Sequence, residues 1–107
     1  MSQKPETAFR GKLVPKLKAL PNSWWESIQQ KTIQGTPDII GCLSGVFIGL
    51  ELKATAKSPI TELQLLKQDR IKAAGGYAAV VYPENAELIL THLTMIAHKG
   101  HTCLRSL

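Results

Sequence analysis

The sequence predicts an α/β domain, in which a small mixed central sheet is flanked by helices. An apolar stretch over residues 35–53 is interrupted once, at Ser44-Gly45, and so divides into two strands. A helical pattern over 58–76 follows, and then a short apolar run at 77–82. Strand, helix and strand in succession favour a right-handed parallel crossover. An antiparallel hairpin and a parallel strand would therefore share one sheet, in a single domain over residues 1–107.

The first predicted element is a weak helix over residues 6–20. Its apolar residues recur at helical spacing: Phe9, Leu13, Leu17 and Leu20. Pro15 lies within this pattern and is expected to kink or split the helix. A turn at 20–23 then leads into a strand over 24–30, with Trp24 on one face and Trp25 on the other. Trp24-Trp25 could stack on bases, but packing in the core or in a dimer is the favoured interpretation.

The apolar stretch predicts two strands, 38–43 and 46–53, joined by a tight turn at Ser44-Gly45. Cys42 lies in the first of these strands and is expected to be a small core residue.

The helix over 58–76 has the clearest signals. Thr61 and Gln64 match a capping box, and Gly75-Gly76 supplies a C-terminal stop. An apolar stripe is expected to face the core: Leu63, Leu66, Ile71 and Ala74. The run at 77–82 lacks alternation, as in a strand buried on both faces. A last helix is predicted over 84–98, with Ile89, Leu93 and Ile96 on one face.

The composition restricts the classes of function. The formal net charge is +5, which favours polyanion partners such as nucleic acid, although a basic solvated surface would have the same composition. No apolar run reaches the ~18 residues that span a bilayer, so no membrane partner is expected. The N-terminal residues lack the apolar segment of a secretory signal, and there are two cysteines. We therefore expect a cytoplasmic protein, associated with the nucleoid or present in a phage-infected host.

The predicted hairpin brings charged residues together at its open end. Counting outward from the turn, Leu43 faces Val46, and five residues further along each strand Asp38 faces Glu51. Their Cα atoms would be about 4.5–5.5 Å apart. Lys53 lies two residues beyond Glu51 and so shares its face. A shift of one residue in the register would separate this group.

Two opposed carboxylates repel each other, and a divalent cation removes that conflict. Mg²⁺ typically takes one or two carboxylates, with waters and substrate phosphate completing its coordination. A neighbouring ammonium can orient a water or stabilise charge on a phosphate. Asp38, Glu51 and Lys53 thus favour phosphodiester hydrolysis. The alternative is structural: an ion pair between Glu51 and Lys53, and an Asp38 that caps the turn after Pro37.

Three segments together resemble the PD-(D/E)xK nuclease superfamily: "GTPD" at 35–38, "ELK" at 51–53 and "SPITELQ" at 58–64. Their spacing is similar to that of its virus-type replication-repair branch, the VRR-NUC domain, and the resemblance extends from about Glu6 to about Asn85. It implies a restriction-endonuclease-like core and an endonuclease that depends on Mg²⁺ or Mn²⁺.

The resemblance also implies roles for individual residues. Asp38 and Glu51 would ligate the metal, with the Leu52 carbonyl as a further ligand. Lys53 would position or activate the attacking water. Gln64 would help to hold that water or Lys53, and could at the same time satisfy the capping box.

Further positions complete the expected site. Glu6, on the first helix, is the candidate for an additional catalytic acid, and Gly35 would let the backbone turn into the strand. Basic residues are expected to contact DNA phosphates: Arg10, Lys12, Lys16 and Lys57.

The expected partner is DNA, and the resemblance implies branched structures such as four-way junctions. The expected assembly is a homodimer, which suits two symmetric cuts. Two alternatives stay open: cleavage of plain duplex DNA, and a non-catalytic nucleic-acid-binding or assembly subunit with a nuclease-like fold. The group His98, His101 and Cys103 could suggest zinc, but a structural zinc site normally needs four ligands. A polar C-terminal tail is the favoured interpretation.

Overall fold

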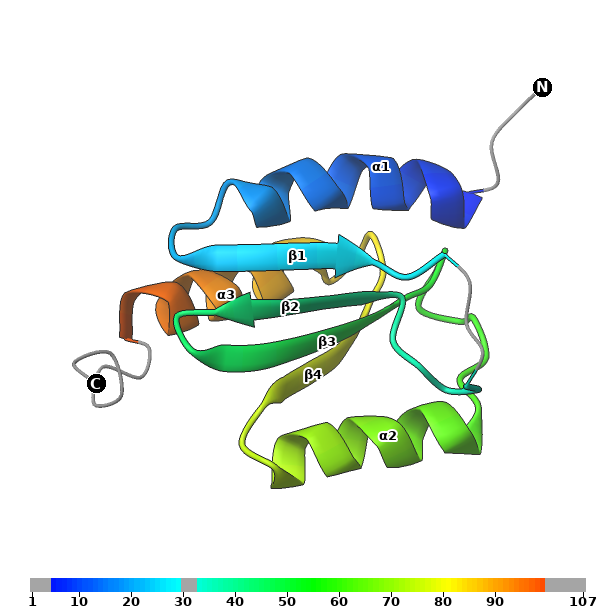
Figure 1. The fold of residues 1–107 in the computed structure, drawn as a ribbon. Helices are drawn as coiled ribbons and strands as arrows, with labels where there is room; N and C mark the ends of the chain where they lie inside the picture. Colours follow the sequence, from blue (N-terminus) through cyan, green and yellow to red (C-terminus); the bar gives the residue numbers. More distant parts are fainter. Residues whose placement is uncertain (1–4, 30–32, 100–107) are drawn as a thin grey trace.

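A computed structural model describes residues 5–29 and 33–99 of the chain (Figure 1). Three helices and four strands follow one another in the order α1 (Pro5–Lys18), β1 (Ser23–Ser27), β2 (Ile39–Leu43), β3 (Val46–Leu52), α2 (Glu62–Ala73), β4 (Tyr77–Val81) and α3 (Ala86–Lys99). The order of helices and strands agrees with the sequence prediction, and most boundaries differ by one to four residues. The α/β class is confirmed.

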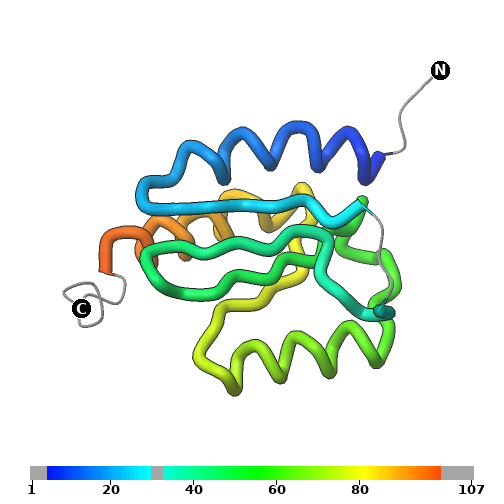
Figure 2. The backbone as a smooth tube through the Cα atoms, in the orientation of Figure 1, coloured from blue at the N-terminus to red at the C-terminus, as the bar shows by residue number. Residues whose placement is uncertain are grey.

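The four strands form one mixed sheet in the order β1-β2-β3-β4. The β1–β2 and β2–β3 pairs are antiparallel, and the β3–β4 pair is parallel. Helix α2 makes the crossover between the two parallel strands, and its path can be followed in the backbone trace (Figure 2). The predicted hairpin is confirmed in its register, because Leu43 pairs with Val46 across the turn.

Helices cover both faces of the sheet, with α1 and α2 on opposite sides (Figure 1). The main core lies between the sheet and the pair α1 and α3, and its largest fully buried side chains are Leu17, Ile39, Leu43, Ile48, Leu50, Leu52, Leu93 and Val81. Trp25 belongs to this core, and its ring lies where a Cβ on Gly41 of the neighbouring strand would be. Helix α2 packs over β3 and β4 on the other face.

The first helix runs without interruption through Pro15, so the prediction of a helix split at this residue is wrong. Pro15 is exposed, and Phe9, Leu13 and Leu17 on the buried side keep α1 against the sheet. Tertiary packing of that side outweighs the loss of one hydrogen bond.

Helix α2 begins with the predicted capping box. The Thr61 hydroxyl accepts a hydrogen bond from the backbone N–H of Gln64 at 3.1 Å. In return, the backbone N–H of Thr61 donates to Gln64 Oε1 at 3.0 Å. Just beyond the helix, Gly75 adopts φ of 93°, a left-handed conformation that favours glycine and ends the helix.

The predicted apolar stripe on α2 is not buried. Leu63 and Leu66 are exposed, whereas Gln64, Gln68 and Ile71 lie closer to the sheet. The contacts of Gln64 with β3 fix the rotation of the helix, and they direct the leucines away from the sheet. The prediction from apolar periodicity is therefore wrong for Leu63, Leu66 and Ala74, whereas Ile71 does pack against Gly49 of β3.

Cys42 is exposed, which corrects its assignment to the core. It alternates along β2 with the buried residues Gly41 and Leu43, so its side chain points to the opposite face. On that face Cys42 pairs with Trp24 of β1 and Phe47 of β3, both also exposed. The sheet face beside α2 is thus open over β1 and β2.

On the α3 side of β4, the Tyr77 hydroxyl and His92 Nδ1 are 3.1 Å apart and share a hydrogen bond. Burial raises the pKa of the Tyr77 phenol above its usual value of 10.0.

His98 is exposed at the end of α3, and His101 and Cys103 lie outside the described residues. Within residues 5–29 and 33–99, no three or more His, Cys, Asp or Glu side chains gather into a group that could hold a metal. No helix in this part of the chain is long and apolar enough to cross a membrane.

Candidate active site

The predicted charged group lies at one end of the sheet. The register of β2 and β3 pairs Ile39 with Leu50, and one further step along both strands sets Asp38 opposite Glu51. The start of β2, the end of β3 and the N-terminal ends of α1 and α2 all lie at this end (Figure 1). Both carboxylate residues are buried, each with 5% relative exposure.

Asp38 is held by the strands on either side of it. Its Oδ2 accepts a hydrogen bond from the Leu52 amide at 2.7 Å. Its backbone carbonyl accepts from the Ile28 amide at 2.8 Å. The side chain therefore caps the open end of the hairpin and lies over the last residue of β3.

The same hydrogen bond indicates where the Leu52 carbonyl points. In a strand, the N–H and C=O of one residue face the same neighbouring strand. Because the Leu52 N–H meets Asp38, its carbonyl also faces the Asp38 side of β3. A backbone oxygen thus lies beside the two carboxylates.

Gln64 links α2 to the end of β3. Its Nε2 donates to Glu51 Oε1 at 3.0 Å, and its Oε1 lies 3.4 Å from the Lys53 Nζ. The same Oε1 accepts from the Thr61 amide. Gln64 therefore closes the capping box and also contacts both Glu51 and Lys53.

Arg10 joins the site from α1. A guanidinium nitrogen lies 3.6 Å from Asp38 Oδ1, and another donates to Ser27 Oγ at 2.9 Å. The sequence prediction placed Arg10 among residues that grip DNA, and the structure places it against the Asp38 carboxylate.

Glu6 lies in the first turn of α1, on the same side of the helix as Arg10. Among the described residues it does not join Asp38 and Glu51 in a group of three acidic side chains of the kind that holds a metal. The structure thus brings together Asp38, Glu51, Lys53 and Gln64, with Glu6 on the adjacent helix.

Comparison with solved structures identifies the fold. One chain described as "VRR_NUC domain" matches with a TM-score of 0.65 over 92% of this chain and 100% of that chain, at 17% sequence identity. The chain has the VRR-NUC fold. No family model matches the sequence, and no curated protein matches it at the significance required.

The three predicted motifs lie at the same end of the sheet. "GTPD" leads into β2, "ELK" ends β3, and "SPITELQ" contains the cap of α2. Gly35 has φ of 81°, a conformation that favours glycine, so the loop before Asp38 depends on this residue.

The donor atoms of the site suit a divalent cation such as Mg²⁺ or Mn²⁺. Two buried carboxylates and a backbone carbonyl are hard oxygen ligands, which these ions prefer. Two cations lie nearby: Arg10 of α1 lies beside Asp38, and Lys53 lies beside Gln64, which also binds Glu51. Asp38, Glu51 and Leu52 are therefore the residues that would hold the ion.

The remaining residues predicted to contact DNA lie outside this group. Lys12 and Lys57 are exposed. Lys16 lies 3.6 Å from Glu87 of α3 in an ion pair with both side chains largely in solvent, and such a pair holds a lysine only weakly.

Proposed function

We propose that this protein is a divalent-metal-dependent endonuclease that hydrolyses DNA phosphodiesters. The observation that carries the proposal is the contact between the β2–β3 hairpin and α2. The β2–β3 register sets Asp38 opposite Glu51, and Gln64 connects Glu51 with Lys53. The VRR-NUC fold supports a nuclease, since it is the fold that the motifs predict.

Each residue has a distinct task in this proposal. Asp38 and Glu51 hold the cation, and the Leu52 carbonyl assists them. When bound, Mg²⁺ or Mn²⁺ supplies the positive charge that offsets negative charge on the scissile phosphate. The Lys53 ammonium orients the attacking water, and Gln64 fixes the position of Lys53.

We further propose branched DNA, including four-way junctions, as the preferred substrate. The net charge of +5 favours a polyanion, so binding should weaken steeply as salt is raised. The exposed Lys12, Lys16 and Lys57 are the residues that would contact phosphates. Such contacts position the DNA and carry no sequence information.

A homodimer is part of this proposal, because two symmetric cuts in a junction suit a two-fold assembly. Exposed leucines on α2 offer apolar surface for such contact: Leu63, Leu65 and Leu66. Sedimentation of the parent and of Leu66→Glu tests this assembly, and a parent that sediments as a monomer would exclude it.

The activity is tested by incubating the protein with a labelled four-way junction and a labelled linear duplex, in Mg²⁺ or in EDTA. The proposal expects cleavage of the junction in Mg²⁺ alone, and loss of at least about a hundred-fold in rate for Asp38→Ala or Lys53→Ala, as for a group that acts on transition-state charge. Leu88→Ala, at an exposed side chain of α3, is the control and should cleave like the parent.

The outcomes separate the alternatives. DNA binding without cleavage in any metal would show a non-catalytic nucleic-acid-binding subunit. Cleavage of the linear duplex at the rate of the junction would keep the nuclease and remove the preference for branched DNA.

A further inference from the structure

The sheet face that carries Glu51 remains open beyond α2. Along β3, Glu51, Gly49 and Phe47 alternate onto one face, and Gly49 lies beneath Ile71 of α2. Phe47 is in register with Cys42, and Cys42 with Trp24, so three side chains form a row across three strands. Trp24 is 57% exposed and Phe47 is 46% exposed. Two aromatic rings thus lie on the same face as the candidate site.

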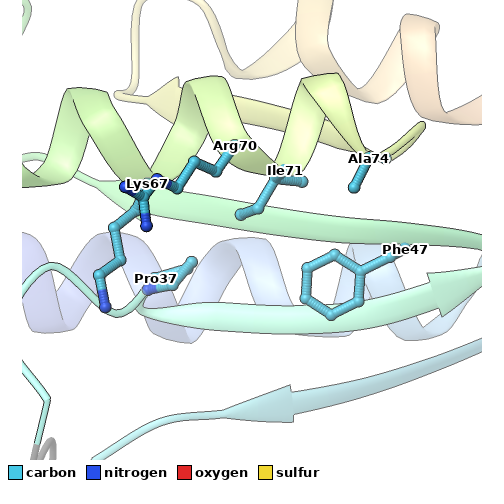
Figure 3. A pocket seen from close by; sticks show the side chains of 7 residues that line it. Pro37, Phe47, Lys67, Arg70, Ile71 and Ala74 are labelled. Atoms are coloured by element: carbon cyan, nitrogen blue, oxygen red, sulfur yellow. The ribbon is translucent and has the colours of Figure 1, made fainter.

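A pocket of about 400 Å³ continues this row toward the site. Its walls come from β3, from α2 and from the loops before β2 and β4: Pro37, Phe47, Lys67, Arg70, Ile71, Ala74 and Gly76. The charged ends of Lys67 and Arg70 extend toward the end of the pocket where Pro37 lies, and Phe47 lies toward the other end (Figure 3). Pro37 directly precedes Asp38, so the cations lie between the aromatic row and the candidate site.

The charge around the pocket has one sign. Among the described residues that line it, Lys67 and Arg70 are charged and none is a carboxylate. Asp69 follows Lys67 by two residues and so projects from α2 about 200° further round the helix. Glu26 of β1 alternates onto the same face as Trp24, but it lies on the edge strand, is not among the residues that line this pocket, and also lines a separate cavity with Lys18 of α1. Neither Asp69 nor Glu26 therefore lies beside Lys67 and Arg70 in this pocket.

We propose that this surface binds unpaired nucleotides of a DNA strand, with bases stacked on Trp24 and Phe47 and phosphates held by Lys67 and Arg70. Aromatic platforms beside a basic groove are the typical means of binding single strands. The Trp24 and Phe47 Cα atoms are two strand spacings apart, about 10 Å. DNA supplies a negative charge with every nucleotide, whereas a protein partner would need acidic groups placed against both cations.

The position of this surface links it to cleavage. Phe47 and Glu51 are four positions apart on β3, or about 13 Å along the strand. This length corresponds to about four nucleotides at the stacked rise of about 3.4 Å. The surface would receive the unpaired nucleotides next to the bond that is cut. That role in the reaction rests on the proposed function, but binding itself does not require cleavage.

Binding is therefore measured in EDTA at low salt, with a labelled twelve-nucleotide oligothymidylate and a blunt twelve-base-pair duplex. Trp25 is buried, so quenching of tryptophan fluorescence reports mainly on Trp24. We expect the oligothymidylate to quench this fluorescence and to bind more tightly than the duplex. Trp24→Phe should bind with similar affinity, measured by anisotropy, but lose most of the quenching.

Phe47→Ala should weaken oligothymidylate binding at least about five-fold, the lower limit for loss of one stacked base. Leu88→Ala is the matched control, since Leu88 is 57% exposed on α3, which packs on the other side of the sheet, and it should bind like the parent. If Phe47→Ala does not fold, the double variant Lys67→Gln, Arg70→Gln replaces it. It should lower the slope of log affinity against log salt by about 1.4 for single strands.

Any one of the following results would overturn the inference: oligothymidylate bound no better than duplex, Phe47→Ala binding equal to that of Leu88→Ala, or a double variant with an unchanged salt slope. If Phe47→Ala changes the sedimentation of the protein but not its affinity for DNA, this surface makes contact between copies of the chain. That result would also overturn the inference. Oligothymidylate binding that persists when no DNA is cleaved in Mg²⁺ would contradict only the proposed nuclease.

Discussion

Replacing Gln64 by Ala should destabilise the folded protein and the active site together. The substitution removes a donor to Glu51 Oε1 at 3.0 Å and an acceptor for the Thr61 amide at 3.0 Å. It also removes the oxygen that lies 3.4 Å from the Lys53 Nζ. No other residue of α2 supports both the helix cap and the candidate catalytic group.

The expected loss follows from these contacts. A hydrogen bond to a charged group contributes about 1.5–3 kcal/mol, and an ordinary one about 0.5–1.5 kcal/mol. Alanine is the better helix former and regains a few tenths of a kcal/mol. The free energy of unfolding should therefore fall by about 2–4 kcal/mol, which lowers the midpoint of urea unfolding by about 1–3 M.

The assay is equilibrium unfolding in urea, followed by circular dichroism. Gln68→Ala is the matched control, because Gln68 lies one turn later and is buried, but its Nε2 has no hydrogen-bond partner among the described residues. It should stay within about 1 kcal/mol of the parent, since the lost packing is offset by removal of an unpaired amide. A Gln64→Ala protein as stable as Gln68→Ala would refute this account of α2.

Three further predictions concern the fold. Gln68→Met should raise the urea midpoint, with a gain of about 1 kcal/mol, because it keeps the side-chain volume and removes the buried unpaired amide; a lower midpoint would show that the amide is satisfied. Gly41→Ala should lower the melting temperature because its Cβ would overlap the Trp25 ring, whereas Gly11→Ala, with no atom in the way, should raise it; equal shifts would contradict the packing described. Because burial raises the pKa of Tyr77, the folded state retains the phenol proton more strongly than the unfolded state. The free energy of unfolding should therefore fall as pH rises through about 10. Urea titrations at pH 9 and 11 should show a smaller fall in this free energy for Tyr77→Phe than for the parent.

Much of the fold follows from local signals. Ser44-Gly45 determines the hairpin register, and Ser44 and Gly45 have φ of 50° and 86° in the turn. Thr61 and Gln64 determine the start of α2. Because each signal lies within a few residues of the structure that it specifies, the sequence alone could place Asp38 opposite Glu51.

Other features depend on contacts between distant segments. Cys42 is exposed because α2 covers β3 and β4 but not β2, and this offset cannot be read from an apolar run. The leucines of α2 face outward because Gln64 binds Glu51, 13 positions earlier. Arg10 lies against Asp38 only once α1 packs on the sheet, so its charge alone suggested a contact with DNA.

Direct measurement of divalent-ion binding tests the central claim most directly. Isothermal titration with MnCl₂ should show binding to the parent, and Asp38→Asn and Glu51→Gln should each weaken it at least about ten-fold, because each removes one of the two carboxylate ligands. Glu87→Gln, at an exposed carboxylate, should bind like the parent. Equal Mn²⁺ affinity in all four proteins would contradict the account.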